Sequence, residues 1–131
     1  MKLNHVNLTV TDVPQTRRLF ETYFGLTPSR EGGSENFDVM FDDGGSVITL
    51  MKGTEASYPK TFHVGFIQES EEQVNEINQR LKDDGFDVEP PKRFHGSWTF
   101  YFRTAGGLTI EVLTLPRPQG KDTYRIPRSL H

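Results

Sequence analysis

The stretch GGLTIEV, residues 106–112, repeats the pattern of an earlier stretch, GGSVITL, residues 44–50. Another landmark recurs at nearly the same distance, because His5 lies 58 residues before His63, against 62 residues between the two quoted stretches. Loop insertions in one copy explain the small difference in spacing. Self-similarity of this kind indicates duplicated structural units, so the chain is expected to contain one module twice.

Each copy has the pattern of one strand, one helix and three further strands. Residues 3–10 alternate apolar and polar side chains, which predicts a strand that is buried on one face. Asp12 and Ser70 each precede an apolar stripe at helical spacing and are followed three residues later by Gln, a capping-box pattern. Gly25 and Gly85 are expected to end these helices, because glycine tolerates the left-handed conformation of a helix stop. The other expected strands are residues 27–31, 35–43 and 44–53 in the first copy and residues 60–68, 86–90, 96–104 and 107–115 in the second.

Length and composition restrict the class of protein. With 131 residues, the chain is long enough for one domain with its own core. The net charge of −3 gives no reason to expect nucleic acid or an anionic membrane as a partner. No apolar run approaches the roughly 18 residues of a membrane span, and the N-terminus alternates as a strand does rather than as a signal peptide. The lack of cysteine excludes disulfides, thiolate metal sites and a cysteine nucleophile, and it fits a cytoplasmic protein.

The expected fold class is α+β, with two paired βαβββ modules that form a curved mixed sheet, or cup, and carry both helices on its outer face. One such module is too small to bury its own sheet face, so the two are expected to pack together. The domain is expected to span residues 1–115, with modules at residues 1–52 and 61–115 and a linker between them. Residues 116–131 are expected to form a C-terminal arm.

Strand alternation places three candidate metal ligands on the sheet face that points away from the helices. Apolar alternates such as Val6 and Ile110 are expected to face the helices. His5, His63 and Glu111 then face the other way, and two imidazoles with one carboxylate are a typical ligand set for a divalent metal with open positions. A cation would also explain why an isolated carboxylate stands among apolar neighbours, since burial of an unpaired charge is costly.

Simpler interpretations of these three residues stay open at this point. A single histidine in a strand is usually a hydrogen-bonded structural residue. Glu111 could form an ion pair with Arg103 on a neighbouring strand instead of binding a metal. The joint pattern favours a metal site, because His5 and His63 occupy equivalent positions in the two copies.

Four fragments together resemble the vicinal oxygen chelate superfamily, which includes glyoxalase I, extradiol dioxygenases, fosfomycin-resistance enzymes and bleomycin-resistance binding proteins. The fragments are LNHVNLTVTDV, a helix that ends in YFGL, TFHVGF and FYFRTAGGLTIEVL. Their order and spacing carry the resemblance, which extends from the N-terminus over both modules. The resemblance implies that His5, His63 and Glu111 bind one divalent metal ion, which would be Fe2+, Mn2+, Zn2+ or Ni2+.

The fourth metal position of that family, on the last strand of the first module, is Thr49 in this chain. Glyoxalase-I-like members have a carboxylate there that also carries protons, and a threonine hydroxyl has too high a pKa for that role. The resemblance therefore points less to glyoxalase I than to the three-ligand set of extradiol dioxygenases and fosfomycin transferases.

The strand register of the family implies further residues in the wall of the cup. Thr99 and Tyr101 are expected to face inward and to hydrogen-bond the substrate, and His95, in a loop near the mouth, is a candidate proton shuttle. Tyr101 would equally suit the role of an ordinary amphipathic core residue, and His95 that of a solvated loop histidine.

The leading functional hypothesis is a metal-dependent enzyme that acts on a small molecule with vicinal oxygens, through dioxygenase-, lyase- or transferase-like chemistry. The alternative is a metal-free protein that sequesters a drug or metabolite, as bleomycin-resistance proteins do, and a vestigial site is a third option. The three retained ligands favour the enzyme, because sequestering members commonly lack them. The expected partners are the small molecule and a second copy of the chain, with Tyr124 and Ile126 of the arm as candidate contacts in the homodimer.

Overall fold

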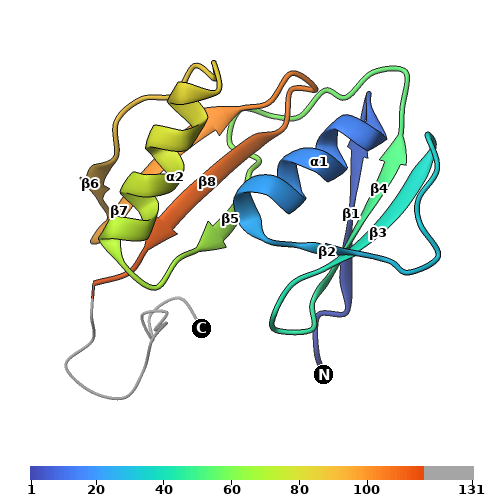
Figure 1. Cartoon of the computed structure of the whole chain (residues 1–131), viewed down its shortest axis with the longest axis horizontal. Coiled ribbons are helices and arrows are strands. Elements are labelled where there is room, and N and C mark those ends of the chain that lie inside the picture. The colour runs from blue at the N-terminus through green and yellow to red at the C-terminus, as the bar shows by residue number, and fades with distance from the viewer. Residues whose placement is uncertain (117–131) are drawn as a thin grey trace. The chain divides into compact units, whose positions relative to one another are not determined.

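The computed structural model describes residues 1–116 and divides the chain into two compact units (Figure 1). The first unit contains residues 1–62 together with residues 103–108, and the described part of the second contains residues 63–102 and 109–116. Each unit has one helix and a four-stranded mixed sheet, which confirms the expected α+β class and the order of elements. The predicted C-terminal arm, apart from Pro116, lies outside the described residues.

The first unit has a sheet in which two distant strands run parallel. Its elements are β1 (His5–Val10), α1 (Val13–Phe24), β2 (Thr27–Pro28), β3 (Phe37–Phe41) and β4 (Val47–Lys52). The strand order is β1-β4-β3-β2, with β1 and β4 parallel and the other pairs antiparallel. This register places Asn7 of β1 opposite Thr49 of β4.

The second unit repeats this topology. Its elements are β5 (Val64–Ile67), α2 (Glu71–Asp83), β6 (Lys92–Phe94), β7 (Ser97–Arg103) and β8 (Thr109–Thr114). The strand order is β5-β8-β7-β6, with β5 and β8 parallel. Gly65 of β5 lies opposite Glu111 of β8, so the register of the parallel pair matches that of the first unit and confirms the predicted alignment of the two copies.

Both helices begin as the sequence predicts. The side chain of Asp12 accepts the N–H of Gln15 at 3.0 Å, and the side chain of Ser70 accepts the N–H of Gln73 at 3.2 Å. These contacts satisfy N–H groups that have no partner inside the helix. Gly25 ends α1 with a φ of 66°, in the left-handed region that glycine adopts at low cost.

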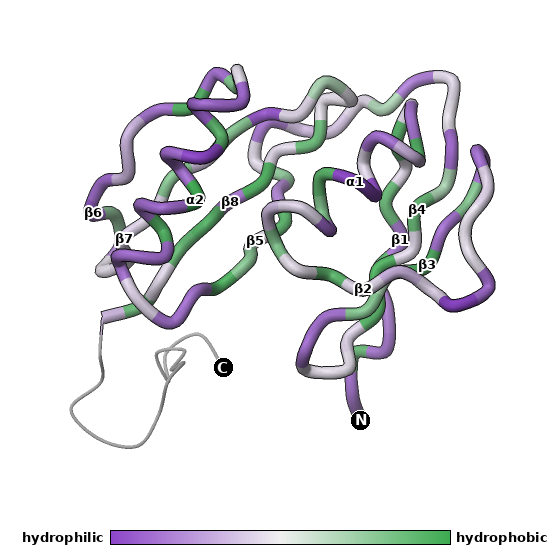
Figure 2. Tube along the Cα trace, viewed as in Figure 1, coloured by the Kyte–Doolittle hydropathy of each residue, from purple (hydrophilic) through white to green (hydrophobic). Residues whose placement is uncertain are grey.

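Each helix buries one apolar stripe. Figure 2 shows hydrophilic residues along α2 interrupted by hydrophobic ones, as expected of a helix with one buried face. No helix within the described residues is both long and apolar enough to cross a membrane. The stripes consist of Leu19, Phe20 and Tyr23 in α1 and of Val74, Ile77 and Leu81 in α2.

The prediction of a strand at residues 86–90 is wrong. The chain forms β6 instead, and this strand begins only after Pro91. Pro90 and Pro91 have no N–H to donate to a strand ladder, which prevents an earlier start. The N–H of Phe86 bonds back to the carbonyl oxygen of Leu81 at 2.9 Å, so the beginning of the predicted strand belongs to the end of α2.

Two further details differ from expectation. The strand expected at residues 27–31 is only the short β2, because the N–H of Gly32 bonds to the carbonyl oxygen of Ser29 at 3.1 Å and closes a turn. Val6 was expected to face the helix but is 38% exposed, whereas Leu8 on the same strand face is buried. The helix-facing core of β1 therefore begins at Leu8.

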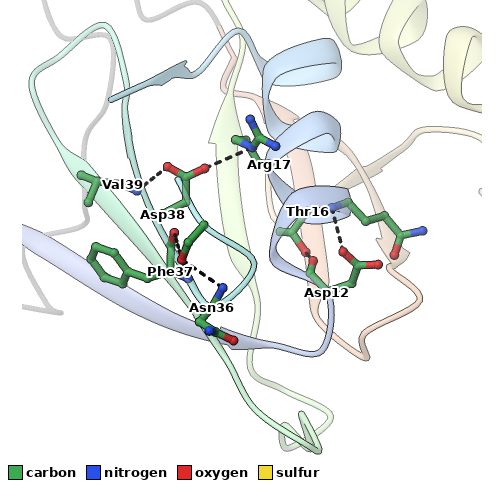
Figure 3. Close-up of polar contacts among 9 residues, drawn as sticks. Asp12, Thr16, Arg17, Asn36, Phe37, Asp38 and Val39 are labelled. Carbon is green, nitrogen blue, oxygen red and sulfur yellow. Dashed lines mark hydrogen bonds and ion pairs between the residues drawn. The ribbon is translucent and has the colours of Figure 1, made fainter. Parts of the chain in front are cut away.

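A buried carboxylate, Asp38, links β3 to α1. Its side chain is fully buried, and its Oδ1 accepts the N–H of Val39 at 2.8 Å (Figure 3). Its Oδ2 lies 3.1 Å from Nε of Arg17 on α1, which is partly exposed. The ion pair is a contact between sheet and helix that forms only when the two pack together.

Gly33→Ala is expected to destabilise the protein by about 1–3 kcal/mol, because an added Cβ would overlap the Asp38 carboxylate. That carboxylate cannot move aside easily, since it is buried and held by Arg17. Gly44→Ala is the matched control, because an added Cβ there would meet Asp42 at an ordinary 3.5 Å. Urea unfolding measures both variants, and equal free energies of unfolding would contradict the prediction.

Candidate functional site

Glu111 of β8 is a largely buried carboxylate in the sheet of the second unit. Its side chain is 13% exposed, and its backbone lies opposite Gly65 of β5. Its carboxylate contacts Thr99 and Tyr101 of β7 and also His63, the residue before β5. A carboxylate that is this buried needs polar partners to stay ionised. The contacts with these three residues therefore determine the chemistry of the cluster around Glu111.

Thr99 holds one oxygen of Glu111 from inside the unit. Its hydroxyl donates to Oε2 of Glu111 at 2.7 Å and has the carbonyl oxygen of Val112 as a second acceptor at 3.2 Å. Thr99 has 0% of its surface exposed. A substrate contact of Thr99 stays a prediction of the sequence. In the structure, both acceptors of its hydroxyl belong to β8.

Tyr101 lies beside the same carboxylate with a neutral phenol. Burial, the hydrogen bond with Glu111 and the negative charge of Glu111 together raise the pKa of Tyr101 to about 12. The phenol ring meets the imidazole of His63 edge to face, with 5.4 Å between the ring centroids. At neutral pH Tyr101 is therefore a hydrogen-bond donor in this cluster and not a base.

His63 faces the other oxygen of Glu111. Its Nε2 lies 3.3 Å from Oε1 of Glu111, and its side chain is 40% exposed. Two of the three expected metal ligands thus lie next to each other within one unit. Arg103, the alternative partner considered for Glu111, donates its Nε–H to the carbonyl oxygen of Gly107 at 3.4 Å.

Gly65 leaves open a position that Asn7 fills in the first unit. There, the hydroxyl of Thr49 donates to Oδ1 of Asn7 at 2.7 Å, so the two equivalent side chains bind each other. In the second unit, an added Cβ at Gly65 would lie 3.5 Å from Leu113 and 3.8 Å from Oε1 of Glu111. Gly65 is a site residue that strand alternation does not indicate, although it lies 58 residues after Asn7, the same spacing as between His5 and His63.

The other two candidate histidines, His5 and His95, lie on other elements. His5 opens β1 in the first unit, where it is exposed and has Nδ1 2.8 Å from Oδ1 of Asn4. His95 has a φ of 51° and Gly96 a φ of 78°, which makes them the two-residue turn between β6 and β7, and the His95 ring packs on Phe94. In the described part of the chain, neither unit by itself holds three His, Asp or Glu side chains placed to share one metal ion.

Tyr101 is expected to ionise near pH 12 in metal-free protein, about two units above an ordinary tyrosine. Because its pKa is raised on folding, the stability it contributes is fully present below about pH 10 and is lost as the pH rises through about 12. An absorbance titration of wild type minus Tyr101→Phe measures the midpoint.

Glu111→Gln should lower this midpoint, since the negative charge of Glu111 is removed while the burial of Tyr101 remains. Circular dichroism at each pH verifies that the protein is still folded. A wild-type midpoint close to the ordinary value of about 10 would contradict the assignment.

The comparisons with known proteins agree with this fold. The family model of the Glyoxalase/Bleomycin resistance protein/Dioxygenase superfamily matches residues 2–112. Among solved structures, that of a possible glyoxalase from Bacillus cereus is 60% identical, with a TM-score of 0.79, and the match covers 86% of this chain and 98% of that chain. None of the curated proteins compared with the chain matches it.

Two more distant structures are similar in fold alone. The fosfomycin resistance protein FosX from Listeria monocytogenes, complexed with Mn(II) and a sulfate ion, is 22% identical with a TM-score of 0.73, and the match covers 88% of this chain and 90% of that chain. Lactoylglutathione lyase from Agrobacterium tumefaciens is 18% identical with a TM-score of 0.66, over 86% of this chain and 92% of that chain. Since the family model spans most of the sequence, this chain belongs to the glyoxalase/bleomycin resistance protein/dioxygenase superfamily.

Proposed function

We propose that this protein is a metal-dependent enzyme that acts on a small molecule with two neighbouring oxygens. His63 and Glu111 would bind one divalent ion, Fe2+, Mn2+, Zn2+ or Ni2+, and His5 would be the third ligand. The observation that carries the proposal is the approach of His63 Nε2 to Glu111 Oε1 at 3.3 Å. A homodimer and a cytoplasmic location stay predictions of the sequence.

The donors present fit such an ion. Among the described residues, the side chains that contact the Glu111 carboxylate are two hydroxyls and an imidazole, with no lysine or arginine. Its charge is therefore held by hydrogen bonds and by His63, and a divalent cation would neutralise it more completely. Imidazole and carboxylate together suit zinc, iron, manganese and nickel better than calcium, which prefers an all-oxygen site.

The exposure of His63 supports a site that a small molecule can enter. Its side chain is 40% exposed, whereas Glu111 is 13% exposed, so the imidazole lies on the solvent side of the carboxylate. A bound ion would supply Lewis-acid stabilisation of negative charge on substrate oxygens. Tyr101 stays protonated at neutral pH and can donate a hydrogen bond to substrate, if substrate replaces Glu111 as its acceptor.

The relatives support a metal enzyme without naming the reaction. The Listeria fosfomycin resistance protein shares this fold and was solved with Mn(II). The Bacillus relative is named a possible glyoxalase. In this chain, however, Thr49 donates its hydroxyl to Asn7, so the first unit has no carboxylate at the position where glyoxalase I chemistry is expected to need one.

Metal analysis tests the proposal directly. Wild-type protein purified without chelator and supplied with excess Mn(II), Zn(II), Fe(II) or Ni(II) is expected to retain close to one ion per chain. Glu111→Gln and His63→Ala should retain almost none, because each removes a ligand. His5→Ala should weaken binding if His5 is the third ligand.

Glu76→Gln is the matched control for Glu111→Gln, because Glu76 is an exposed residue of α2. It removes the same charge and should leave metal content unchanged. Wild-type protein that binds none of these ions in excess would refute the proposal.

Activity is then measured with the loaded protein on catechols with oxygen, on hemithioacetals, and on fosfomycin with thiols. Turnover that falls with metal content in Glu111→Gln supports the enzyme. Turnover that is unchanged in Glu111→Gln would show that the metal site is not the catalytic one. Tight metal-free binding of an aromatic compound without turnover would favour sequestration.

Gly65 gives an independent steric test. Gly65→Asn copies the residue of the first unit and is expected to weaken metal binding strongly, because its side chain would cover Oε1 of Glu111. Gly65→Ala is the control, since its Cβ would make only ordinary contacts of 3.5 Å or more. Titration calorimetry with Zn(II) measures both, and equal affinities in the two variants would count against this reading of the site.

A further inference from the structure

We propose that Thr99 is a positioning residue that fixes Oε2 of Glu111 and thereby directs Oε1 toward the ion. The inference rests on the proposed function, because it assigns different roles to the two oxygens of one metal ligand. In this proposal, Thr99 orients the Glu111 carboxylate, whereas the sequence suggested that Thr99 contacts the substrate.

The hydroxyl of Thr99 has one proton and two acceptors within reach. Oε2 of Glu111 lies at 2.7 Å and the carbonyl oxygen of Val112 at 3.2 Å. A hydrogen bond to an ionised acceptor is shorter and stronger than one to a neutral carbonyl. The proton is therefore directed to the carboxylate and not to the Val112 carbonyl.

Thr99 is rigid, whereas the side chain of Glu111 is not. Thr99 is fully buried on β7, and its branched Cβ restricts the rotation of the hydroxyl about χ1. Glu111 has three rotatable bonds, and a carboxylate that is free to rotate would present its oxygens to an ion in many orientations. The hydrogen bond from Thr99 to Oε2 restricts that rotation, in addition to the contacts of the carboxylate with Tyr101 and His63.

The two oxygens of Glu111 then point to different surroundings. Oε2 faces the buried hydroxyl of Thr99, while Oε1 faces the partly exposed His63 and the space beside Gly65. Oε1 is thus the oxygen that an entering ion would meet together with His63 Nε2. Partners that orient a metal ligand in this way typically contribute about 10- to 100-fold in metal affinity.

Thr99→Val tests the role, because valine keeps the shape and burial of threonine but has no hydroxyl. Titration with Zn(II) alone is expected to show an affinity about 10- to 100-fold below wild type, with close to one ion per chain at saturation. Thr99→Ser keeps the hydroxyl but lacks the branched Cβ, so its affinity should lie well above that of Thr99→Val. A purely structural role would not be rescued in this way.

Thr114→Val is the matched control for the loss of a buried hydroxyl. Thr114 is 4% exposed on β8, and its hydroxyl donates to the carbonyl oxygen of Gln68 at 2.8 Å, away from Glu111. Thr114→Val should lower the free energy of unfolding as Thr99→Val does, yet leave Zn(II) affinity unchanged. Equal losses of affinity in both variants would show a general effect of destabilisation and overturn the proposal.

A crystal structure of metal-free Thr99→Val separates this proposal from the function on which it rests. The Glu111 carboxylate is expected to turn away from the orientation seen here. If wild type binds Zn(II) and Thr99→Val binds it equally tightly, the role of Thr99 fails while the metal site stands. If wild type binds no metal, the function fails, and an unmoved carboxylate in Thr99→Val would refute the positioning role as well.

Discussion

The burial of one carboxylate in a β-sheet constrains much of the second unit. Glu111 is flanked by β5 and β7, and each neighbouring strand contributes a residue that suits the charge. On one side, Gly65 makes room beside Oε1, and on the other, Thr99 and Tyr101 donate hydrogen bonds. Apolar residues at those positions would leave an ionised group without partners, which costs several kcal/mol by order of magnitude. The buried carboxylate of Glu111 thus explains why these neighbours are small or polar.

The two units show what changes when the same register carries a neutral pair. Asn7 and Thr49 occupy the positions of Gly65 and Glu111, and they satisfy each other through one hydrogen bond. The first unit therefore has a neutral pair at that point, whereas among the described residues the charge in the second unit contacts two hydroxyls and an imidazole. The two copies share one strand register, and the second has a carboxylate where the first has a threonine. The two units therefore have the same topology but different side chains at this position.

The sequence predicted the features that depend on local contacts. Asp12 and Ser70 cap their helices through N–H groups three residues away, and such contacts form within a single turn. The alignment of the two copies was also predicted, since equal strand registers follow from equal spacing of glycines and apolar residues. Residues 86–90 alternate apolar and polar side chains as a strand does, but Pro90 cannot donate to a strand ladder, so the strand begins later, at Lys92.

Features that depend on how deeply a side chain is buried could not be predicted from the sequence. Strand alternation placed Thr99 on the same face as Glu111, but it could not show that the hydroxyl is fully buried, because burial depends on how β7 and β8 pack. The ion pair of Asp38 with Arg17 could not be predicted for the same reason. Its partners belong to a strand and a helix that meet only in the folded unit. Alternation gives the face of a side chain, and tertiary packing decides what that face touches.

Protonation states narrow the chemistry that the cluster around Glu111 can perform. Burial and the charge of Glu111 raise the pKa of Tyr101 to about 12. At neutral pH this phenol is therefore protonated, donates a hydrogen bond and does not act as a base. Thr99 is committed to Oε2 and has no exposed surface. If His63 and Glu111 bind the ion, the described residues of this cluster leave no free base beside it. A reaction in which water or the second substrate accepts the proton therefore fits the second unit better than one that needs a protein carboxylate to move a proton across the substrate.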